Sequence, residues 1–416
     1  MRLQVISDSN YTELTSCLAC TSSRLLQYLD LTDQPLANSF IHQSEEIIKY
    51  PLSLNVCKEC FHSQLSIAVD PSILFRNYLY VSGTTTTLLD YFDWFTKNYI
   101  DAHGKELKVL DIASNDGSLL KVVRMHGHLC LGIDPAANLM PLAAENEVAT
   151  ICDFWPGQSS KFLKDDFDIV IGMNVFAHIA NPVEFLRAAA AIIKSNGKVL
   201  IQTSQAMMVR NTEFDTAYHE HLSFFNVSSM KKVAARAGVY LVDVELTAIH
   251  GISYLWTFQN TPAFESPRLL KLEQEEKDSG LTAIDTYLSF GVKAELVALE
   301  VKNIVEGALG EGYEVWGYGA AAKGNTFINF SEIKLSGIVD DNPLKQGLNS
   351  PGGNILVYPP EHLSKIKKPI CFVIPAWNFA SEITEKIKAI RPESSDMLLT
   401  YFPKVEYKPI RSNNLL

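Results

Sequence analysis

Residues 108–118 read Lys-Val-Leu-Asp-Ile-Ala-Ser-Asn-Asp-Gly-Ser, and this stretch decides the fold of the middle of the chain. Its apolar first half predicts a short buried strand. Its small and polar second half predicts a turn that opens a helix over Ser118–Met125. The same order repeats downstream, with strands expected at Cys130–Asp134, Phe167–Asn174 and Lys198–Thr203, a helix around Pro141–Asn146, and a helix from Pro182 that Asn196-Gly197 stops. This alternation predicts a doubly wound, mostly parallel α/β sheet with helices on both faces.

The turn after the first strand has the character of a cofactor site. Asp111 lies in the strand, and Asp134 ends the next strand, where an acidic residue can hold ribose hydroxyls. The turn lacks the three glycines that seat a pyrophosphate, which argues against NAD. A loop with Asp111, Asn115 and Asp116 would repel phosphates but suits a cationic cofactor such as S-adenosylmethionine. The alternative is that these residues are ordinary caps and turns. Further candidates are Ser114, Gly117, Pro135, Asn174, and, for the amino group and ring face of adenine, Asp153 and Phe154.

Four of the seven cysteines form two Cys-x-x-Cys pairs, Cys17/Cys20 and Cys57/Cys60. Each pair aims two thiolates at one point, and two pairs complete a tetrahedral Zn²⁺ site. Disulfides are the alternative, but Met1 is not followed by the basic and apolar leader of a secreted protein. We expect a structural zinc ion, because four thiolates leave no open coordination position. The other cysteines, expected as buried thiols, are Cys130, Cys152 and Cys371.

The bulk properties predict a soluble cytoplasmic enzyme. The 416 residues are 47% hydrophobic and 20% charged, and their number suits two or three domains. The formal net charge of −11 argues against a nucleic-acid partner. No apolar run is long enough to cross a bilayer, so we expect no membrane partner. A monomer is the simplest expectation.

A second α/β pattern follows a charged helical stretch at Leu269–Val305. Strands are expected at Tyr313–Gly319, Gly337–Asp341 and Ile370–Pro375. We expect this pattern to form a second, Rossmann-like domain.

The glycine turn of this second pattern predicts a phosphate site. Gly317-Tyr-Gly-Ala-Ala-Ala-Lys-Gly-Asn325 lies at a strand-to-helix junction, where free backbone N–H groups, the helix dipole and Lys323 attract phosphate. We expect it to hold the diphosphate of a sugar nucleotide, with Trp377 available to stack on the base. The alternative is a vestigial dinucleotide fold that only packs. The expected contacts are Tyr318, Gly319, Lys323, Gly324, Asn325, Asp340, Asn342, Lys345, Trp377 and Asn378.

Tyr218-His-Glu-His221 gathers a phenol, two imidazoles and a carboxylate in four positions. Histidine is the natural general base near neutral pH, so this segment is a candidate catalytic site. The alternatives are a surface loop before Leu222-Ser-Phe-Phe and a weak His-x-His metal site. His178 is a further candidate, although a lone histidine at the start of a helix can simply cap it.

Taken in order, these motifs resemble a known family, the sugar C-methyltransferases that act on nucleotide-linked 4-keto-deoxysugars. The family is typified by the C-3 methyltransferases of tetronitrose and mycarose biosynthesis. The resemblance covers nearly the whole chain. It is carried by Cys17-x-x-Cys20, Cys57-x-x-Cys60, Tyr78-x-Tyr80-x-Ser82, Ser114-Asn-Asp-Gly, Asn174-Val-Phe-Ala-His178, Tyr218-His-Glu-His-Leu222, Gly317-Tyr-Gly-Ala-Ala-Ala-Lys-Gly324 and Asp340-Asp-Asn-Pro.

The resemblance implies three domains: a zinc-binding domain over 1–75, a methyltransferase domain over 76–265 and a Rossmann-like sugar-nucleotide domain over 266–416. The chain departs from the family pattern at His250-Gly-Ile-Ser-Tyr-Leu-Trp. Members commonly carry His-Gly-Gly-Ser followed by an arginine there. The departure implies a different acceptor in that region, or other groups that bind the cofactor or the sugar.

The resemblance also implies roles for single residues. His221 is implied as the base, with Tyr218 and Glu220 placing the sugar and the imidazole. His178 and the phenols of Tyr78 and Tyr80 are implied as hydrogen-bond partners of the keto oxygen or enolate. Thymidine diphosphate is the family's commoner carrier, and guanosine diphosphate is the alternative.

The leading hypothesis is therefore an S-adenosylmethionine-dependent C-methyltransferase acting on C3 of a nucleotide-linked 4-keto-6-deoxy sugar. An O-methyltransferase is the first alternative. A zinc-stapled protein that binds a sugar nucleotide without turning it over is the second.

Overall fold

The computed structural model describes residues 10–42, 47–76, 78, 81–84, 86–164, 166–204, 208–249 and 251–410. The chain forms two compact units that interleave along the sequence. Unit 1 takes Met1–Leu26, Asn55–Ala206 and Glu220–Ile284, and unit 2 takes Gln27–Leu54, Met207–His219 and Asp285–Leu416. The α/β fold class is confirmed, while the three domain boundaries stay a prediction. Among the described helices, none combines the length and the apolar character that a membrane crossing requires.

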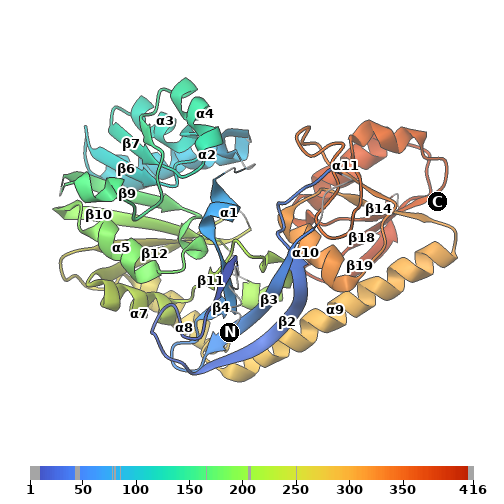
Figure 1. Cartoon of the computed structure of the whole chain (residues 1–416), viewed down its shortest axis with the longest axis horizontal. Helices are drawn as coiled ribbons and strands as arrows, with labels where there is room; N and C mark the ends of the chain where they lie inside the picture. The colour runs from blue at the N-terminus through green and yellow to red at the C-terminus, as the bar shows by residue number, and fades with distance from the viewer. Residues whose placement is uncertain are drawn as a thin grey trace, which may run out of the picture. The chain divides into compact units, whose positions relative to one another are not determined.

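Unit 1 is built on a seven-stranded sheet with the order β12-β13-β10-β9-β6-β7-β8, seen at the left of Figure 1. Strands β6 to β10 run parallel, while β13 pairs antiparallel with β10 and β12 pairs antiparallel with β13. The strands are β6 (Lys108–Ile112), β7 (Leu129–Ile133), β8 (Thr150–Ile151), β9 (Phe167–Met173), β10 (Ile193–Thr203), β12 (Tyr240–Thr247) and β13 (Ser253–Gln259).

Helices cover both faces of this sheet, as the sequence predicts. Figure 1 shows α2 and α3 on one face and α5 and α7 on the other. Two buried clusters match this division: one joins Phe92 of α2 to Leu120 of α3, and the other joins Phe185 of α5 to Val233 of α7. The helices are α1 (Pro71–Phe75), α2 (Thr86–Phe95), α3 (Ser118–Met125), α4 (Met140–Glu145), α5 (Pro182–Ala190), α7 (Val227–Ala237) and α8 (Pro267–Asp278).

One predicted boundary is wrong. Asn196-Gly197 lies inside β10 rather than at the end of the preceding helix, and α5 stops at Ala190. The pairing of β10 with β9 shifts register between Ile193 and Lys198, so the Asn-Gly pair belongs to an irregularity of the strand. A Cβ on Gly197 would lie 2.8 Å from the Cβ of Ile193, so the local geometry favours glycine at this bend.

Short strands complete unit 1 around the cysteine pairs. β1 (Tyr11–Glu13) pairs antiparallel with β5 (Ile67–Val69). β4 (Ser63–Leu65) pairs antiparallel with β11 (Ser223–Phe224), which begins two residues after the Tyr218–His221 segment. The second cysteine pair and the candidate catalytic segment are therefore joined through one short ladder.

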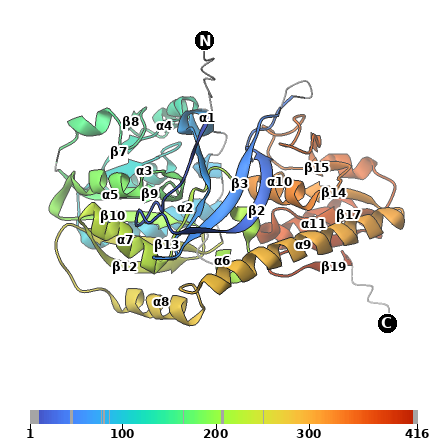
Figure 2. The same cartoon turned by 60° about the horizontal axis from the view of Figure 1, so that its bottom comes forward.

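Unit 2 contains a six-stranded sheet with the order β16-β15-β14-β17-β18-β19, parallel except for β19. Figure 2 shows β14, β15, β17 and β19 together with α9, α10 and α11. The predicted stretch at Leu269–Val305 is two helices, α8 in unit 1 and the 27-residue α9 in unit 2. The elements are β14 (Glu314–Tyr318), β15 (Gly337–Val339), β16 (Val357–Tyr358), β17 (Ile370–Val373), β18 (Met397–Thr400), β19 (Glu406–Pro409), α6 (Met208–Asn211), α9 (Ile284–Gly310), α10 (Ala322–Ser331) and α11 (Ala380–Ile390); β2 (Leu25–Pro35) and β3 (Lys49–Cys57) lie mostly in this unit.

Candidate active site

The two cysteine pairs of unit 1 form matching turns. Thr21 N–H donates to Cys17 O at 2.8 Å, and Phe61 N–H donates to Cys57 O at 2.9 Å. Both closing residues adopt a positive φ, 65° at Thr21 and 57° at Phe61. Each turn also points a backbone N–H at a sulfur, from Cys20 to Cys17 Sγ at 3.5 Å and from Glu59 to Cys57 Sγ at 3.4 Å.

The four sulfur atoms have the spacing of a zinc site. Cys17 Sγ lies 3.6 Å from Cys60 Sγ, Cys20 Sγ lies 3.5 Å from Cys57 Sγ, and all four lie within 4.8 Å of one another. A tetrahedral Zn²⁺ with Zn–S bonds of ~2.3 Å separates its sulfurs by ~3.8 Å. The residues therefore fit a structural zinc ion, and all seven cysteines are free thiols rather than disulfides.

The three single cysteines follow the prediction only in part. Cys371 is buried, Cys130 is half-buried and Cys152 is exposed. The prediction of a buried Cys152 is wrong, because this residue directly follows the short edge strand β8.

Around the end of β6 lie three buried polar atoms without partners within the described structure, one in β6, one in the turn after it and one in β8. They are Asp111 Oδ1, Ser114 Oγ and Thr150 Oγ1. Asp111, Gly132 and Thr150 are register partners across β6, β7 and β8, so they form one row. A Cβ on Gly132 would lie 2.4 Å from Ser114 Oγ and 2.9 Å from Thr150 Oγ1, so the missing side chain leaves room for these hydroxyls.

Two buried acids, Asp111 and Asp134, line this region. Burial raises the pKa of Asp111 well above its ordinary value, and the neighbouring Asp134 raises it further. Asp134 accepts hydrogen bonds from Asn115 N at 2.9 Å and from Ala136 N at 2.8 Å. Orphaned hydrogen-bonding atoms and two buried acids fit a cofactor with cationic and hydroxyl groups, which is the character of S-adenosylmethionine.

Asn115 and Asp116 also have a local use. Asn115 Oδ1 accepts from Ser82 N at 3.0 Å, and Asp116 Oδ2 accepts from Gly83 N at 3.0 Å and Ser118 Oγ at 2.7 Å. These bonds fix η1 (Ser82–Thr84) beside the start of α3. The capping role that the sequence leaves open is therefore present for Asp116.

The remaining cofactor candidates lie in the same unit. Asp153 accepts from Phe154 N at 2.8 Å and from Ser159 N and Oγ at 2.9 and 2.7 Å, and the Ser159 bonds lower its pKa. The Phe154 ring has the Arg76 guanidinium at 5.7 Å from its centroid. Pro135 is half-buried after Asp134, and Gly117 opens α3 in the left-handed conformation.

A pair of histidines, His178 and His221, lies in unit 1. The His178 and His221 ring centroids lie 5.2 Å apart. The Phe75 ring stacks on His178, with ring centroids 5.5 Å apart and an angle of 3° between the ring planes. Burial lowers the pKa of His178 well below its ordinary value, and the nearby His221 lowers it further. The pair therefore favours a neutral His178. His221 is buried, with 7% of its surface exposed.

A phenol and a carboxylate complete this group. Tyr78 Oη donates to Glu220 Oε2 at 3.1 Å, although the two residues are 142 positions apart. Tyr78 also touches Phe75 edge-on. Within unit 1, the structure thus brings together Tyr78, His178, Glu220 and His221.

The first half of the Tyr218–His221 segment belongs to unit 2. His219 is 1% exposed, its Nε2 lies 3.3 Å from Pro51 O, and burial lowers its pKa to about 4. Because its ring is neutral and packed, His219 differs from His221, which is the candidate base. Tyr218 is half-buried. Tyr80 and His250 lie outside the described residues.

The glycine turn of unit 2 is organised around Lys323 at the start of α10. Lys323 Nζ lies 3.8 Å from the Trp377 ring centroid and 2.9 Å from Asn378 Oδ1, so three predicted substrate contacts meet. Ala321, at the N-cap of α10, makes no side-chain capping bond. The first N–H groups of α10 therefore receive no side-chain cap from this residue.

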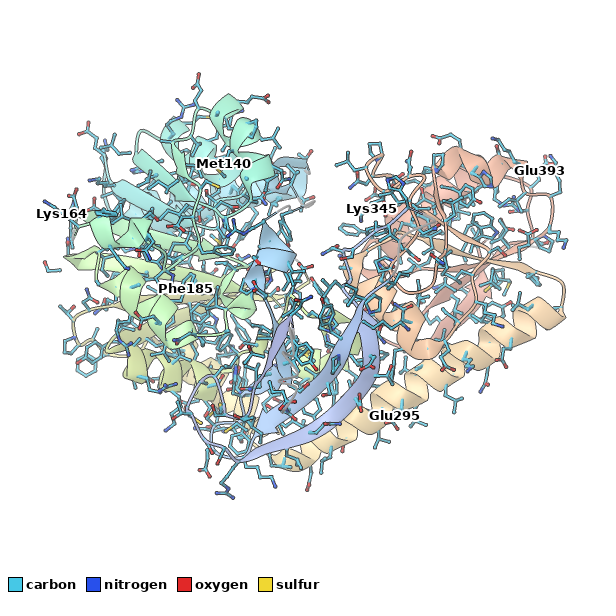
Figure 3. The ribbon with its side chains drawn as sticks, viewed as in Figure 1. Met140, Lys164, Phe185, Glu295, Lys345 and Glu393 are labelled. Carbon is cyan, nitrogen blue, oxygen red and sulfur yellow. The ribbon has the colours of Figure 1, made fainter. Side chains whose placement is uncertain are left out.

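A second group forms at the end of β15. Asp340 accepts from Ala320 N at 2.6 Å and from Asn342 N at 2.8 Å, and Lys345 Nζ donates to Ala320 O at 2.8 Å. Burial lowers the pKa of Lys345, which is marked in Figure 3.

The other predicted substrate contacts differ in accessibility. Gly319 N–H donates to Val339 O at 2.8 Å. Tyr318 is 1% exposed, and its hydroxyl reaches Asp341 Oδ1 at 3.5 Å. Asn325 is 2% exposed and donates to Ala37 O at 2.8 Å, and Gly324 is buried beside it. The side chain of Asn325 thus has a packing partner.

Sequence reasoning missed several participants that only the fold brings together. Phe75 stacks on His178, and Tyr91 Oη donates to Gln202 Oε1, whose Nε2 donates to Asn174 Oδ1 at 3.3 Å. Gln202 lies one position before the end of the predicted strand Lys198–Thr203, and ligand-facing polar residues collect at strand ends, so its position was the available signal.

Comparisons with known proteins indicate the kind of enzyme to which this chain is similar. Three family models match in order: a zinc binding domain over residues 17–75, a methyltransferase domain over 88–244 and a C-methyltransferase C-terminal domain over 248–403. C-methyltransferase NovU of Streptomyces niveus is 27% identical over 90% of this chain and 92% of its own length. A ubiquinone biosynthesis O-methyltransferase of Dinoroseobacter shibae is 24% identical over 40% of this chain and 77% of its own.

Among solved structures, magnesium protoporphyrin IX methyltransferase of Synechocystis PCC 6803 with bound S-adenosylmethionine is 14% identical. It covers 42% of this chain and 79% of its own, with a TM-score of 0.32, too low to carry an argument. The identification follows instead from the three models, the long relative and the four-cysteine site. The chain is similar along most of its length to zinc-binding C-methyltransferases, and it is an S-adenosylmethionine-dependent methyltransferase.

Proposed function

We propose that the enzyme methylates C3 of a nucleotide-linked 4-keto-6-deoxy sugar in the cytoplasm. The observation that carries the proposal is the contact of the His178 and His221 rings, 5.2 Å apart, beside the buried Glu220. The order of the sequence motifs and the similarity to C-methyltransferase NovU support it.

Methylation at carbon requires a carbanion equivalent, so a base must remove a proton. In a 4-keto sugar the carbonyl acidifies the proton at C3. We assign its removal to His221, because its imidazole is buried beside His178 and an imidazole nitrogen can accept a proton as a general base. The proton moves from C3 to an imidazole nitrogen, and the electron pair remains on the sugar as an enolate.

His178 suits the complementary task. Because its pKa is held low, it stays neutral when His221 takes up the proton. A neutral imidazole can donate one N–H, and we assign this donor to the keto oxygen, where negative charge develops. The hydrogen bond from Tyr78 fixes Glu220, which we assign to placing the His221 ring. Tyr218 and Tyr80 remain proposed partners of the sugar.

When bound, S-adenosylmethionine supplies the methyl group from its sulfonium centre. We assign the ribose hydroxyls of the cofactor to Asp134 and its adenine to Asp153 and Phe154. The amino group of its methionine part is assigned to the acidic end of β6 around Asp111. Ser114 Oγ adds a buried acceptor at that turn.

For the nucleotide we propose the start of α10 in unit 2. A half-buried Lys323 at a helix N-terminus without a side-chain cap suits a diphosphate. Trp377 and Asn378, which contact Lys323, are the proposed partners of the base.

The test is direct product analysis. The zinc-loaded enzyme is incubated with S-adenosylmethionine and a dTDP- or GDP-linked 4-keto-6-deoxyhexose, and the product is examined by mass spectrometry and NMR. We expect one added methyl group on C3, bonded to carbon. A methyl group on oxygen would instead establish the O-methyltransferase alternative, and no transfer to either sugar nucleotide would refute the proposed substrate class.

A further inference from the structure

Asp215 is a buried acid in unit 2 that neither the cofactor turn nor the histidine pair uses. It lies in η7 (Phe214–Thr216), three positions before Tyr218, and is 0% exposed. An aspartate without solvent contact is costly unless its environment compensates the charge, so its surroundings indicate its role.

The carboxylate holds a residue of the proposed nucleotide site. Asp215 Oδ2 accepts from Trp377 Nε1 at 2.9 Å and from Tyr401 Oη at 3.2 Å. Asp215 Oδ1 is buried and has no partner within the described structure. Trp377 follows the end of β17, and Tyr401 follows the end of β18, so Asp215 ties together two neighbouring strand ends.

Trp377 lies between a cation and an anion. Lys323 Nζ lies 3.8 Å from the ring centroid, on the electron-rich face, while the positive N–H edge points at Asp215. The groups facing Asp215 are Lys323 from α10, Glu213 from its own segment, and the Trp377 and Tyr401 donors. Burial is the largest of these influences and raises the pKa of Asp215 to about 7.

The segment from Asp215 to Tyr218 is short and fixed. Thr216 N–H donates to Glu213 O at 3.2 Å, and Ala217 N–H donates to Phe214 O at 3.1 Å. The Phe214 ring packs on Phe327 of α10, with centroids 5.8 Å apart. A displacement of Asp215 therefore moves the backbone that carries Tyr218.

We propose that Asp215 is a positioning residue that couples occupancy of the Lys323–Trp377 nucleotide site to the placement of Tyr218. The inference rests on the proposed nucleotide site. A diphosphate that draws Lys323 toward itself changes the charge over the Trp377 ring, and Trp377 transmits this change through its N–H to Asp215. Substrate without its nucleotide would then bind without ordering Tyr218.

Three variants and a matched control separate coupling from stability. Asp215→Asn keeps an acceptor for the indole but removes the charge, and Asp215→Ala removes both. Trp377→Phe shows which part of the tryptophan emission comes from Trp377, by comparison with the wild type. The control is Asp396→Asn, because Asp396 is also buried in unit 2 but binds Arg391 and Ser394 instead.

The first readout is tryptophan emission against pH. We expect a wild-type transition near pH 7 that is absent from Asp215→Asn and Trp377→Phe and present in Asp396→Asn. The second is calorimetry with thymidine diphosphate and guanosine diphosphate. We expect Asp215→Ala to lose about tenfold in affinity for the diphosphate that binds, the size of one lost hydrogen bond to a charged group. S-adenosylhomocysteine affinity should stay within about twofold, since that site is in unit 1.

The third readout is turnover. We expect Asp215→Asn to lower kcat more than it raises KM, whereas Asp396→Asn should change only the folded fraction. If the wild type binds neither diphosphate, both the nucleotide site and the coupling fall. If the wild type binds one and both Asp215 variants bind and turn over like it, the nucleotide site stands and the coupling alone is refuted.

Discussion

Replacing Cys57 by serine should remove the zinc ion and destabilise unit 1. The site joins Cys20 to Cys57, which are 37 positions apart. By the chain-entropy relation for a cross-link, closing a loop of that length contributes about 4 kcal/mol. Cys57 is fully buried in the same apolar cluster as Phe225 and Ala234 of unit 1, so loss of the site also loosens packing.

The assay combines metal content with urea unfolding. We expect about one zinc ion per wild-type chain, released by a chelator only on unfolding, and substantially less in Cys57→Ser. The control is Cys152→Ser, because Cys152 is an exposed single thiol. It should keep its zinc and its unfolding free energy to within about 0.5 kcal/mol. Full zinc content and unchanged stability in Cys57→Ser would refute the assignment of these four thiolates.

Three further predictions follow from the buried acids and the phenol. Asp134→Ala should weaken S-adenosylhomocysteine binding by about tenfold or more in calorimetry, because two backbone donors and the ribose lose their acceptor; unchanged affinity would contradict this. Tyr78→Phe should lower kcat by about tenfold without changing cofactor affinity. A variant kcat equal to that of the wild type would show that the hydrogen bond to Glu220 does not contribute to catalysis. The folded-state pKa of Asp215 is about 7, above its ordinary 3.8, so its carboxyl stabilises the fold at low pH, and this contribution is lost as pH rises through 7. The free energy of urea unfolding should fall between pH 5 and pH 8 by more in the wild type than in Asp215→Asn. An equal change in the two proteins would refute this prediction.

Local signals in the sequence predict the sheets well. The helix over Ser118–Met125 is observed with those bounds, because the turn before it and the apolar spacing within it are both local. Asn196-Gly197 misleads for the same reason: a pair that usually ends a helix is used here for an irregularity in a strand. The tertiary pairing of β10 with β9, not the dipeptide, decides that position.

The candidate site was predictable as a set of residues but not as an arrangement. The two cysteine pairs predict the metal site from the sequence, because the Cys-x-x-Cys spacing by itself brings the two sulfur atoms of each pair together. The bond between Tyr78 and Glu220 and the stacking of Phe75 on His178 join distant parts of the chain, and no local pattern encodes them. Asp215 looks like any turn aspartate until its burial and its Trp377 partner are known.

The assignment of His221 as the base is tested most directly by solvent exchange at the sugar. The enzyme is held with S-adenosylhomocysteine and the 4-keto sugar nucleotide in D₂O, and loss of the C3 proton signal is followed by NMR. We expect the wild type to exchange this proton and His221→Ala to do so about 10²-fold more slowly or less, with cofactor affinity retained. Exchange at the wild-type rate in His221→Ala would contradict the proposed mechanism.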